Sequence, residues 1–431
     1  MLLKEGENWI ETPILGPDGE TLTILLSDLN ADEWPDIFIG NDYAPPDQLW
    51  LSDSEGGFSA SEPGFIKDAT SKWTMSLASA DIDGDLIPEI YSGNISGRQE
   101  AQPKKPVKDC QYEKGAEKEK CIQYTRLTNL FNKARRANDA VGCQSISDPY
   151  LAQGCTVVAL TSILSNGGTG PEAIGDLCEK IPAEWGEFQA LCHTRRSKKL
   201  TPLSDEELNE TLKSDTVTNL LFKQNNSGGV FHDAAEKWQI VDGGWTWNAR
   251  FADLNQDENQ DLYVVNGHSL ARKRYAHKLF MNKKGRFEDE AELAGIASSV
   301  PAAAYTYVDL DRDGDLDIVT VPLVGEIKVY KNQIANMEEN HSVQFTLRGA
   351  ANNTHAIGAK VIIRYGPNGS LAQMREIQMS GGHASFDEAV VHFGLGRHEK
   401  LNAVEIIWPD GKKTMLDTSL AANYRYEIRR Q

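Results

Sequence analysis

One nine-residue acidic pattern occurs four times in this chain of 431 residues and limits the folds open to it. Each copy reads D-x-[DN]-x-D-x-x-x-[DE], and we number the copies loop 1 (residues 28–36), loop 2 (81–89), loop 3 (253–261) and loop 4 (309–317). The loop starts are separated by 53, 172 and 56 residues, so a period of about 55 residues is interrupted once, by roughly 117 residues. A repeat of this length is typical of β-propeller blades or of a solenoid.

Strand-like sequence surrounds every loop. β-Branched and aromatic residues precede loop 1 at 22–26 and follow it at 37–40, and the other three loops have similar flanks. A third strand-like segment comes next in all four units, and a fourth ends the first three units, at 57–58, 230–231 and 286–287. Four strands in about 55 residues is the size of a propeller blade. The sequence therefore predicts a mainly β chain with propeller blades over residues 1–98 and 215–333.

The spacing within each loop predicts a calcium site. Side-chain oxygens at positions 1, 3 and 5 of a tight turn can converge on one point, a backbone carbonyl at position 7 can join them, and a carboxylate at position 9 closes the cage. Six to eight oxygen ligands suit Ca²⁺ better than the smaller Mg²⁺, and clustered carboxylates repel one another without a cation. We therefore expect up to four Ca²⁺ ions. The predicted ligands are Asp28, Asn30, Asp32, Trp34, Asp36, Asp81, Asp83, Asp85, Ile87, Glu89, Asp253, Asn255, Asp257, Asn259, Asp261, Asp309, Asp311, Asp313, Asp315 and Asp317.

Two alternatives apply to the loops. A single loop of this kind can be a solvated acidic turn, but four in the same register favour a metal. An EF-hand needs Glu at position 12 and flanking helices, whereas position 12 is Ile39 in loop 1 and Thr320 in loop 4, between strands. Only loop 4 has glycine at position 6 (Gly314), where a positive φ is comfortable, so loop 4 ranks first. Loops 1 and 3, with Asn at position 3, are expected to bind more weakly.

The interrupting segment differs from the rest of the chain. Residues 96–215 contain 17 basic and 17 acidic residues, so the net charge of −19 lies entirely outside them. Helical patterns occur between residues 124 and 213, and no C-x-x-C pair is present. The sequence predicts an α-helical, disulfide-rich insertion over residues 99–214 and an oxidising compartment; unrelated buried thiols in a cytosolic protein are the alternative. The six cysteines are Cys110, Cys121, Cys143, Cys155, Cys178 and Cys192.

On these loops and strands the sequence resembles the FG-GAP/VCBS repeat family, whose blades build β-propellers. The resemblance covers residues 1–98 and about 215–333, and it implies calcium ligands at positions 1, 3, 5 and 9 of each loop. Residues 341–431 resemble a second family, the ASPIC/UnbV domain, although Ser385 is followed by Phe386 where that family often has Gln. The combination is similar to the cartilage acidic protein family, whose bacterial members are exported or surface proteins. The ASPIC/UnbV-like segments are 356–361, 380–382, 391–396 (VHFGLG) and 404–411 (VEIIWPDG).

The segments at the start of the propeller region and after its end lead to two further predictions. Strand patterns at 360–365 and 403–408, with turns such as Pro-Asp-Gly, predict a small β-sandwich-like C-terminal module. Residues 2–12 have the pattern of the last two strands of a preceding blade, and no signal peptide precedes them. We therefore expect a piece of a longer, exported chain with an incomplete propeller.

The composition and the absence of certain motifs disfavour several classes of function. The acidic balance disfavours a nucleic-acid partner, and no apolar stretch approaches the roughly 20 residues that a spanning helix needs. G-x-S-x-G, H-E-x-x-H and phosphate-binding glycine loops are absent from the sequence. The leading hypothesis is a secreted, periplasmic or cell-surface calcium-binding protein that acts as a non-enzymatic adhesion module or binds a protein or carbohydrate ligand. One alternative is a polysaccharide-active hydrolase or lyase with a pocket at the propeller axis or under the insertion. Another is a purely structural scaffold.

Overall fold

A computed structural model describes residues 2–5, 8–11, 20–42, 47–53, 57–61, 65–66, 73–95, 218–225, 229–267, 275–323, 325–333 and 340–430. The described residues all belong to one compact unit. They form β-strands and one short 3₁₀ helix, η5 (Pro367–Gly369), which confirms the mainly β fold class. The predicted helical insertion, residues 99–214, lies outside the described residues together with all six cysteines. Its helices and disulfides remain predictions without structural support.

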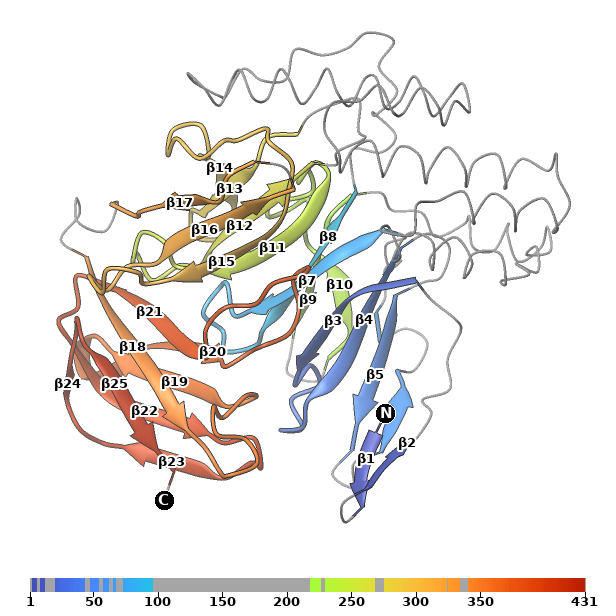
Figure 1. Cartoon of the computed structure of the whole chain (residues 1–431). Helices are drawn as coiled ribbons and strands as arrows, with labels where there is room; N and C mark the ends of the chain where they lie inside the picture. The colour runs from blue at the N-terminus through green and yellow to red at the C-terminus, as the bar shows by residue number, and fades with distance from the viewer. Residues whose placement is uncertain are drawn as a thin grey trace, which may run out of the picture. The chain divides into compact units, whose positions relative to one another are not determined.

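The acidic repeats form successive antiparallel sheets, as predicted (Figure 1). The first three repeats have four strands in chain order and the fourth has three, so the blade assignment is confirmed. An N-terminal hairpin of β1 (Leu2–Glu5) and β2 (Asn8–Glu11) precedes them. Blade 1 contains β3 (Glu20–Ser27), β4 (Asp36–Asp42), β5 (Gln48–Ser52) and β6 (Phe58–Ala60), and blade 2 contains β7 (Thr74–Ala80), β8 (Glu89–Asn94), β9 (Leu220–Gln224) and β10 (Phe231–Asp233). Blade 3 contains β11 (Thr246–Ala252), β12 (Asp261–Asn266), β13 (Lys278–Asn282) and β14 (Phe287–Asp289), and blade 4 contains β15 (Ala302–Val308), β16 (Asp317–Pro322) and β17 (Lys328–Tyr330).

The insertion interrupts blade 2 without breaking its sheet. β8 and β9 are adjacent strands although more than 120 residues separate them, and Ile90 is the register partner of Phe222. This pairing confirms that the insertion enters between the second and third strands of the blade.

Apolar burial holds neighbouring blades together. One core cluster joins blades 1 and 2, where the rings of Phe38 and Phe222 lie 6.1 Å apart. A second cluster joins blades 2 and 3, and a third joins blades 3 and 4. Every residue of β8 and β12 is buried, as expected for strands covered on both faces. Each blade therefore depends on the next for its core.

The C-terminal module is a two-sheet sandwich, which confirms that prediction. β21 (Val390–Gly396), β18 (His341–Arg348) and β25 (Arg425–Arg429) form one sheet, in which β18 and β25 are parallel. The second sheet contains β20 (Leu371–Glu376), β19 (Lys360–Tyr365), β22 (Lys400–Ile407) and β23 (Lys413–Leu416), with β24 (Leu420–Ala421) beside β22. One core cluster includes buried apolar residues from both sheets, such as Phe345, Phe393 and Ile363.

The loop between β20 and β21 ties this module to the blades. Its residues 380–387, here called the crossing segment, contact the first strand of each blade in turn, from blade 1 to blade 4. In a propeller these first strands surround the central channel. The hydrogen bonds are Gly381 N to Ile24 O (2.7 Å), Gly382 N to Leu77 O (2.8 Å), Asn248 Nδ2 to His383 O (3.1 Å) and Ser385 Oγ to Tyr305 O (2.7 Å).

Candidate cation-binding loops

The four acidic loops share one backbone conformation. Positions 4 and 6 have a positive φ in every loop, whether or not the residue is glycine. The glycine at position 6 of loop 4 is therefore not what creates the turn, and the other loops adopt it with residues that usually avoid this region. The angles are Ala31 63° and Glu33 73° in loop 1, Gly84 75° and Leu86 67° in loop 2, Gln256 57° and Glu258 80° in loop 3, and Arg312 62° and Gly314 95° in loop 4.

Two hydrogen bonds recur in all four loops and orient the acidic side chains. The carboxylate at position 9 accepts the backbone N–H of position 2, at 2.8 to 3.1 Å. The carboxylate at position 5 accepts the backbone N–H of position 7, at 2.9 to 3.2 Å. The predicted ligand side chains are thus fixed by their own loop.

The carboxylate at position 9 also accepts a hydrogen bond from outside the loop, which the spacing within the loop did not predict. In loops 1, 3 and 4 its other oxygen accepts a backbone N–H from the chain at the end of the third strand, namely from Ser52, Asn282 and Asn332. This aspartate therefore joins the loop to the third strand of its blade. Each carboxylate oxygen has two lone pairs, so a metal can still be bound.

In loops 2 and 4 the acidic side chains converge. One oxygen from each of Asp81, Asp83 and Glu89 lies within 4.8 Å of the others, and the same holds for Asp309, Asp311 and Asp313. Within the described part of the chain, Asp81 Oδ2 and Asp309 Oδ1 are buried and accept no hydrogen bond. A hard-oxygen cluster with an unsatisfied buried carboxylate oxygen fits a calcium ion.

Loops 1 and 3 are closed by their own hydrogen bonds instead. Both oxygens of Asp28 accept backbone N–H groups, from positions 5 and 6, and Asp253 does the same in loop 3. The amide of Asn30 donates to Asp32 over 2.9 Å, and that of Asn255 donates to Asp257 over 3.1 Å. Loops 1 and 3 are not among the groups of three converging acidic side chains in the described residues.

Burial makes several loop carboxylates costly to ionise. It is the largest cause that raises the pKa of Asp36 and Asp81 to about 6 and that of Glu89 to about 8. The pKa of Asp253 rises to about 8 through burial and the nearby Asp257, and that of Asp315 rises to about 8 through burial and Asp313. A bound divalent cation would favour the ionised forms of these groups.

The C-terminal module contacts the loops through polar side chains that sequence reasoning did not single out. Lys360 Nζ lies 2.7 Å from Asp28 Oδ2 in loop 1, and Gln344 Nε2 donates to Asp309 Oδ2 in loop 4 over 2.8 Å. Arg375 is half-buried, and desolvation of its guanidinium group lowers its pKa, while Asp253 and Asp81 oppose this shift. Position 1 of every loop therefore interacts with the module, and none of these contacts is visible from local spacing.

The HFGLG motif is part of this contact. His392 Nε2 lies 3.0 Å from the carbonyl oxygen of Gly314, and burial lowers the pKa of His392 to about 4. Gly396 N donates to Gln256 O over 2.8 Å. His392 is therefore a neutral residue that bonds loop 4.

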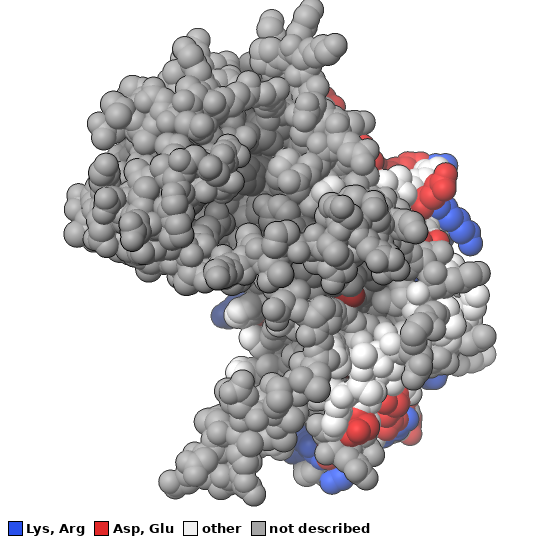
Figure 2. Space-filling model, turned by 90° about the vertical axis from the view of Figure 1, so that its right-hand side faces the viewer, with Lys and Arg blue, Asp and Glu red and all other residues white. Residues whose placement is uncertain are grey.

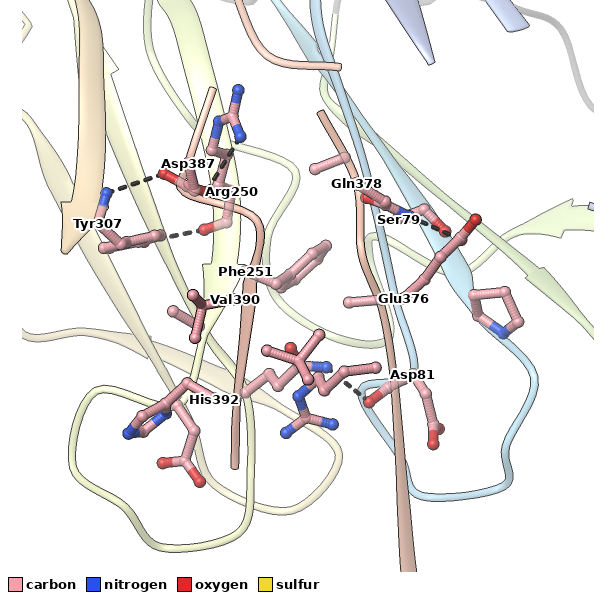
Figure 3. Close-up of a pocket in the computed structure, with 18 of the residues that line it drawn as sticks. Ser79, Asp81, Arg250, Phe251, Tyr307, Glu376, Gln378, Asp387, Val390 and His392 are labelled. Atoms are coloured by element: carbon pink, nitrogen blue, oxygen red, sulfur yellow. Dashed lines mark hydrogen bonds and ion pairs between the residues drawn. The ribbon is translucent and has the colours of Figure 1, made fainter. Parts of the chain in front are cut away.

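A cavity of about 140 Å³ lies between the first strands of blades 2 and 3 and the module (Figure 3). Its acidic residues outside the loops each contact a group other than a carboxylate. Asp387 pairs with Arg250 (3.0 Å), Glu376 accepts from Ser27 Oγ (2.5 Å), and Glu388 pairs with Arg425 (3.1 Å).

Comparisons with known proteins agree with this architecture. Residues 28–92, which contain loops 1 and 2, match the FG-GAP-like repeat, and residues 349–431 match ASPIC and UnbV. The chain contains an FG-GAP-like repeat and an ASPIC and UnbV domain. Both expected resemblances are therefore confirmed over these residues. Among the described residues, no helix has the length and apolar character needed to cross a membrane.

Two curated relatives are similar over part of the chain. Cartilage acidic protein 1 of Mus musculus is 36% identical over 118 residues, which are 26% of this chain and 17% of that protein. Cartilage acidic protein 1 of Homo sapiens is 36% identical over 108 residues, which are 24% of this chain and 15% of that protein. The chain thus aligns with less than a fifth of either relative.

Proposed function

We propose that this protein is a calcium-binding, exported propeller protein that acts as a non-enzymatic adhesion or ligand-binding module. The convergence of three carboxylates in loop 2 and three in loop 4 carries the calcium part of the proposal. The buried oxygens of Asp81 and Asp309 that accept no hydrogen bond support it, because a cation would satisfy them. The shared backbone conformation extends the proposal to loops 1 and 3, whose asparagine amides would then turn their oxygens toward the ion.

Calcium would act as a cross-link in this fold. Each loop connects the first and second strands of a blade, and position 9 joins it to the third strand in three of the blades. The C-terminal module rests on the same loops. A metal bound there would stabilise both a blade and the docking of the module, so that both offer a rigid surface to a protein or carbohydrate ligand.

The exported location is supported by the domain types and by the loop chemistry. Extracellular calcium modules typically bind with dissociation constants of about 10⁻⁴ to 10⁻³ M, which suits loops that compete with internal hydrogen bonds. Figure 2 shows a face of the molecule on which acidic side chains lie beside Lys or Arg side chains. A mixed surface of this kind fits a protein or sugar ligand better than a nucleic acid.

Calcium-dependent stability tests the proposal. Saturation at about 100 times the dissociation constant adds about 2.7 kcal/mol per site, which raises the melting temperature by about 5–10 °C relative to chelator. The measurement is thermal unfolding with calcium, with magnesium and with chelator. Asp309→Asn should reduce the calcium effect, and Glu405→Gln, outside the loops, should not. Equal melting temperatures with calcium and with chelator would contradict the proposal. Calcium-dependent retention on arrayed carbohydrates would then separate a sugar ligand from a protein ligand.

A further inference from the structure

A lysine side chain reaches the converging oxygens of loop 2. Lys223 Nζ lies 2.7 Å from Asp83 Oδ2, 3.1 Å from Asp85 Oδ2 and 2.5 Å from Glu89 Oε1. These are three of the predicted metal ligands, at positions 3, 5 and 9. Glu89 is fully buried and the Lys223 side chain is 17% exposed. One ammonium group therefore contacts three carboxylates at the place expected for a metal ion.

Strand register shows which residues stand at the same place in the other blades. The second residue of the second strand faces Trp50 in blade 1, Phe222 in blade 2, Phe280 in blade 3 and Tyr330 in blade 4. The next residue along the chain is Leu51, Lys223, Met281 and Lys331, respectively. Blades 2 and 4 thus have lysine at this position, and blades 1 and 3 have an apolar residue.

The presence of lysine at this register position correlates with the type of residue at position 3 of the loop. Loops 2 and 4 have Asp at position 3 and lysine at this register position, whereas loops 1 and 3 have Asn at position 3 and an apolar residue at this register position. In loops 1 and 3 the Asn amide donates to position 5, as Lys223 does in loop 2. The extra negative charge at position 3 is therefore matched by a positive charge from the third strand.

The two lysines are not equally placed. Lys331 pairs with Asp311, and its side chain is 55% exposed. In loop 4 the oxygens of Asp309, Asp311 and Asp313 still converge beside it. Lys331 can therefore turn toward solvent and leave loop 4 to a metal, whereas the less exposed Lys223 contacts three ligands at once.

We propose that Lys223 is a built-in cation of loop 2, which holds the place of the metal so that loop 2 binds Ca²⁺ only by displacing the lysine. The inference rests on the proposed calcium binding of the other loops. Ca²⁺ needs six to eight oxygens at about 2.3–2.6 Å, and three of those oxygens already bond the ammonium. The two cations would also repel each other at this distance, so they exclude one another. Loop 2 thereby stays ordered when calcium is scarce.

Calcium stoichiometry of the full chain tests this role. Equilibrium dialysis with radioactive calcium, after chelator treatment, compares the parent protein with Lys223→Met, which introduces the residue type found in blade 3. We expect one additional ion per chain, or at least tenfold tighter binding of one ion. Lys278→Met is the matched control, since Lys278 lies on a third strand but pairs with Asp289 outside the loops, and it should leave binding unchanged. Unchanged number and affinity in Lys223→Met would overturn the inference.

The reciprocal exchange places the lysine in blade 3, at a buried residue of a core cluster, so the folding of this variant is verified first by circular dichroism. Met281→Lys should cost blade 3 one calcium ion, and Met281→Leu should bind as the parent does. Calcium bound equally by the parent, Lys223→Met and Met281→Lys would overturn the role of Lys223 and leave the proposed function standing. No calcium bound by any of them would overturn the proposed function and this inference with it.

Discussion

His277 is a buried polar residue of blade 3 whose ring nitrogen accepts a hydrogen bond. Its side chain is almost fully buried, and its Nδ1 accepts the backbone N–H of Asn266 over 3.1 Å. Its ring meets that of Tyr263 edge-on, at 6.2 Å. Burial lowers the pKa of His277 to about 3, so the ring is neutral in the folded protein at neutral pH. A proton on Nδ1 would remove the acceptor that Asn266 uses.

The lowered pKa of His277 predicts a loss of stability in acid. Between pH 6.5 and 3 the unfolded chain binds a proton at this residue and the folded chain does not, so the free energy of unfolding falls as the pH falls. The slope approaches about 1.4 kcal/mol per pH unit in that window. His277→Asn keeps an acceptor close to the Nδ1 position and removes the titration.

Urea unfolding of parent and variant at pH 7, 6, 5 and 4 measures this slope. The loop carboxylates also titrate in acid, so the difference between the two proteins is the informative quantity. We expect the variant to lose about 2 kcal/mol less than the parent between pH 6 and 4. Parallel curves would show that His277 does not titrate in this way.

At the residue scale, contacts within a loop could be predicted from the sequence, and contacts from a distant strand could not. The predicted loop ligands are within nine residues of one another, so their spacing alone was enough to expect them in one turn. Lys223 is 138 residues from Asp85 and reaches it only because β9 pairs with β8 across the insertion. A cation supplied by a distant strand has no local signal, although the alignment of the four third strands could have shown the alternation of lysine with Leu51 and Met281.

At the scale of elements, strand β21 contains a glycine of the HFGLG motif, Gly394, that is required by the packing of loop 3. Gly394 lies on this strand without a positive φ, so its own backbone does not require glycine. A Cβ atom there would lie 2.0 Å from Asp253 Oδ2 and 2.5 Å from the Cα of Gln256. The glycine is therefore needed because loop 3 packs directly on the strand.

Gly394→Ala should accordingly be costly. Overpacking of this kind destabilises by about 1–3 kcal/mol, and the backbone of Gln256 cannot move aside as a flexible side chain would. Gly285→Ala is a suitable comparison, because its added Cβ meets no atom within 4 Å and only the positive φ is strained, at about 1 kcal/mol. Urea unfolding should place Gly394→Ala below Gly285→Ala in stability, and the reverse order would contradict the packing argument.

The elements themselves were largely predictable, but their long-range pairings were not. Local patterns predicted the blade strands and the strands at 360–365 and 403–408, since β-branched and aromatic runs between turn residues carry that information. The parallel pairing of β18 with β25 and the path of the crossing segment join residues about 80 or more positions apart. No sequence pattern indicated that the segment with Gly381 and Gly382 crosses four blades.

At the scale of the whole described unit, the acidic loops are also the docking surface of the C-terminal module. Lys360 contacts loop 1, the strand with Gly394 packs on loop 3, and Gln344 and His392 bond loop 4. The proposed calcium ligands Asp28, Asp253 and Asp309 therefore also contact the module. A ligand that binds only the docked arrangement would stabilise it by linkage.

This sharing predicts that calcium slows hydrogen exchange in the module as well as in the loops. Removal of calcium should leave the buried carboxylates of loops 3 and 4 uncompensated, so the amides of β21 and of the crossing segment should exchange faster. Hydrogen–deuterium exchange with calcium and with chelator measures the effect. β14, the fourth strand of blade 3, should change little and serves as the internal control, while Asp309→Asn should reproduce the chelator pattern at β21 with calcium present. If calcium raised the melting temperature but left exchange in β21 unchanged, the loops would stabilise the blades alone, and the module would dock without help from the metal.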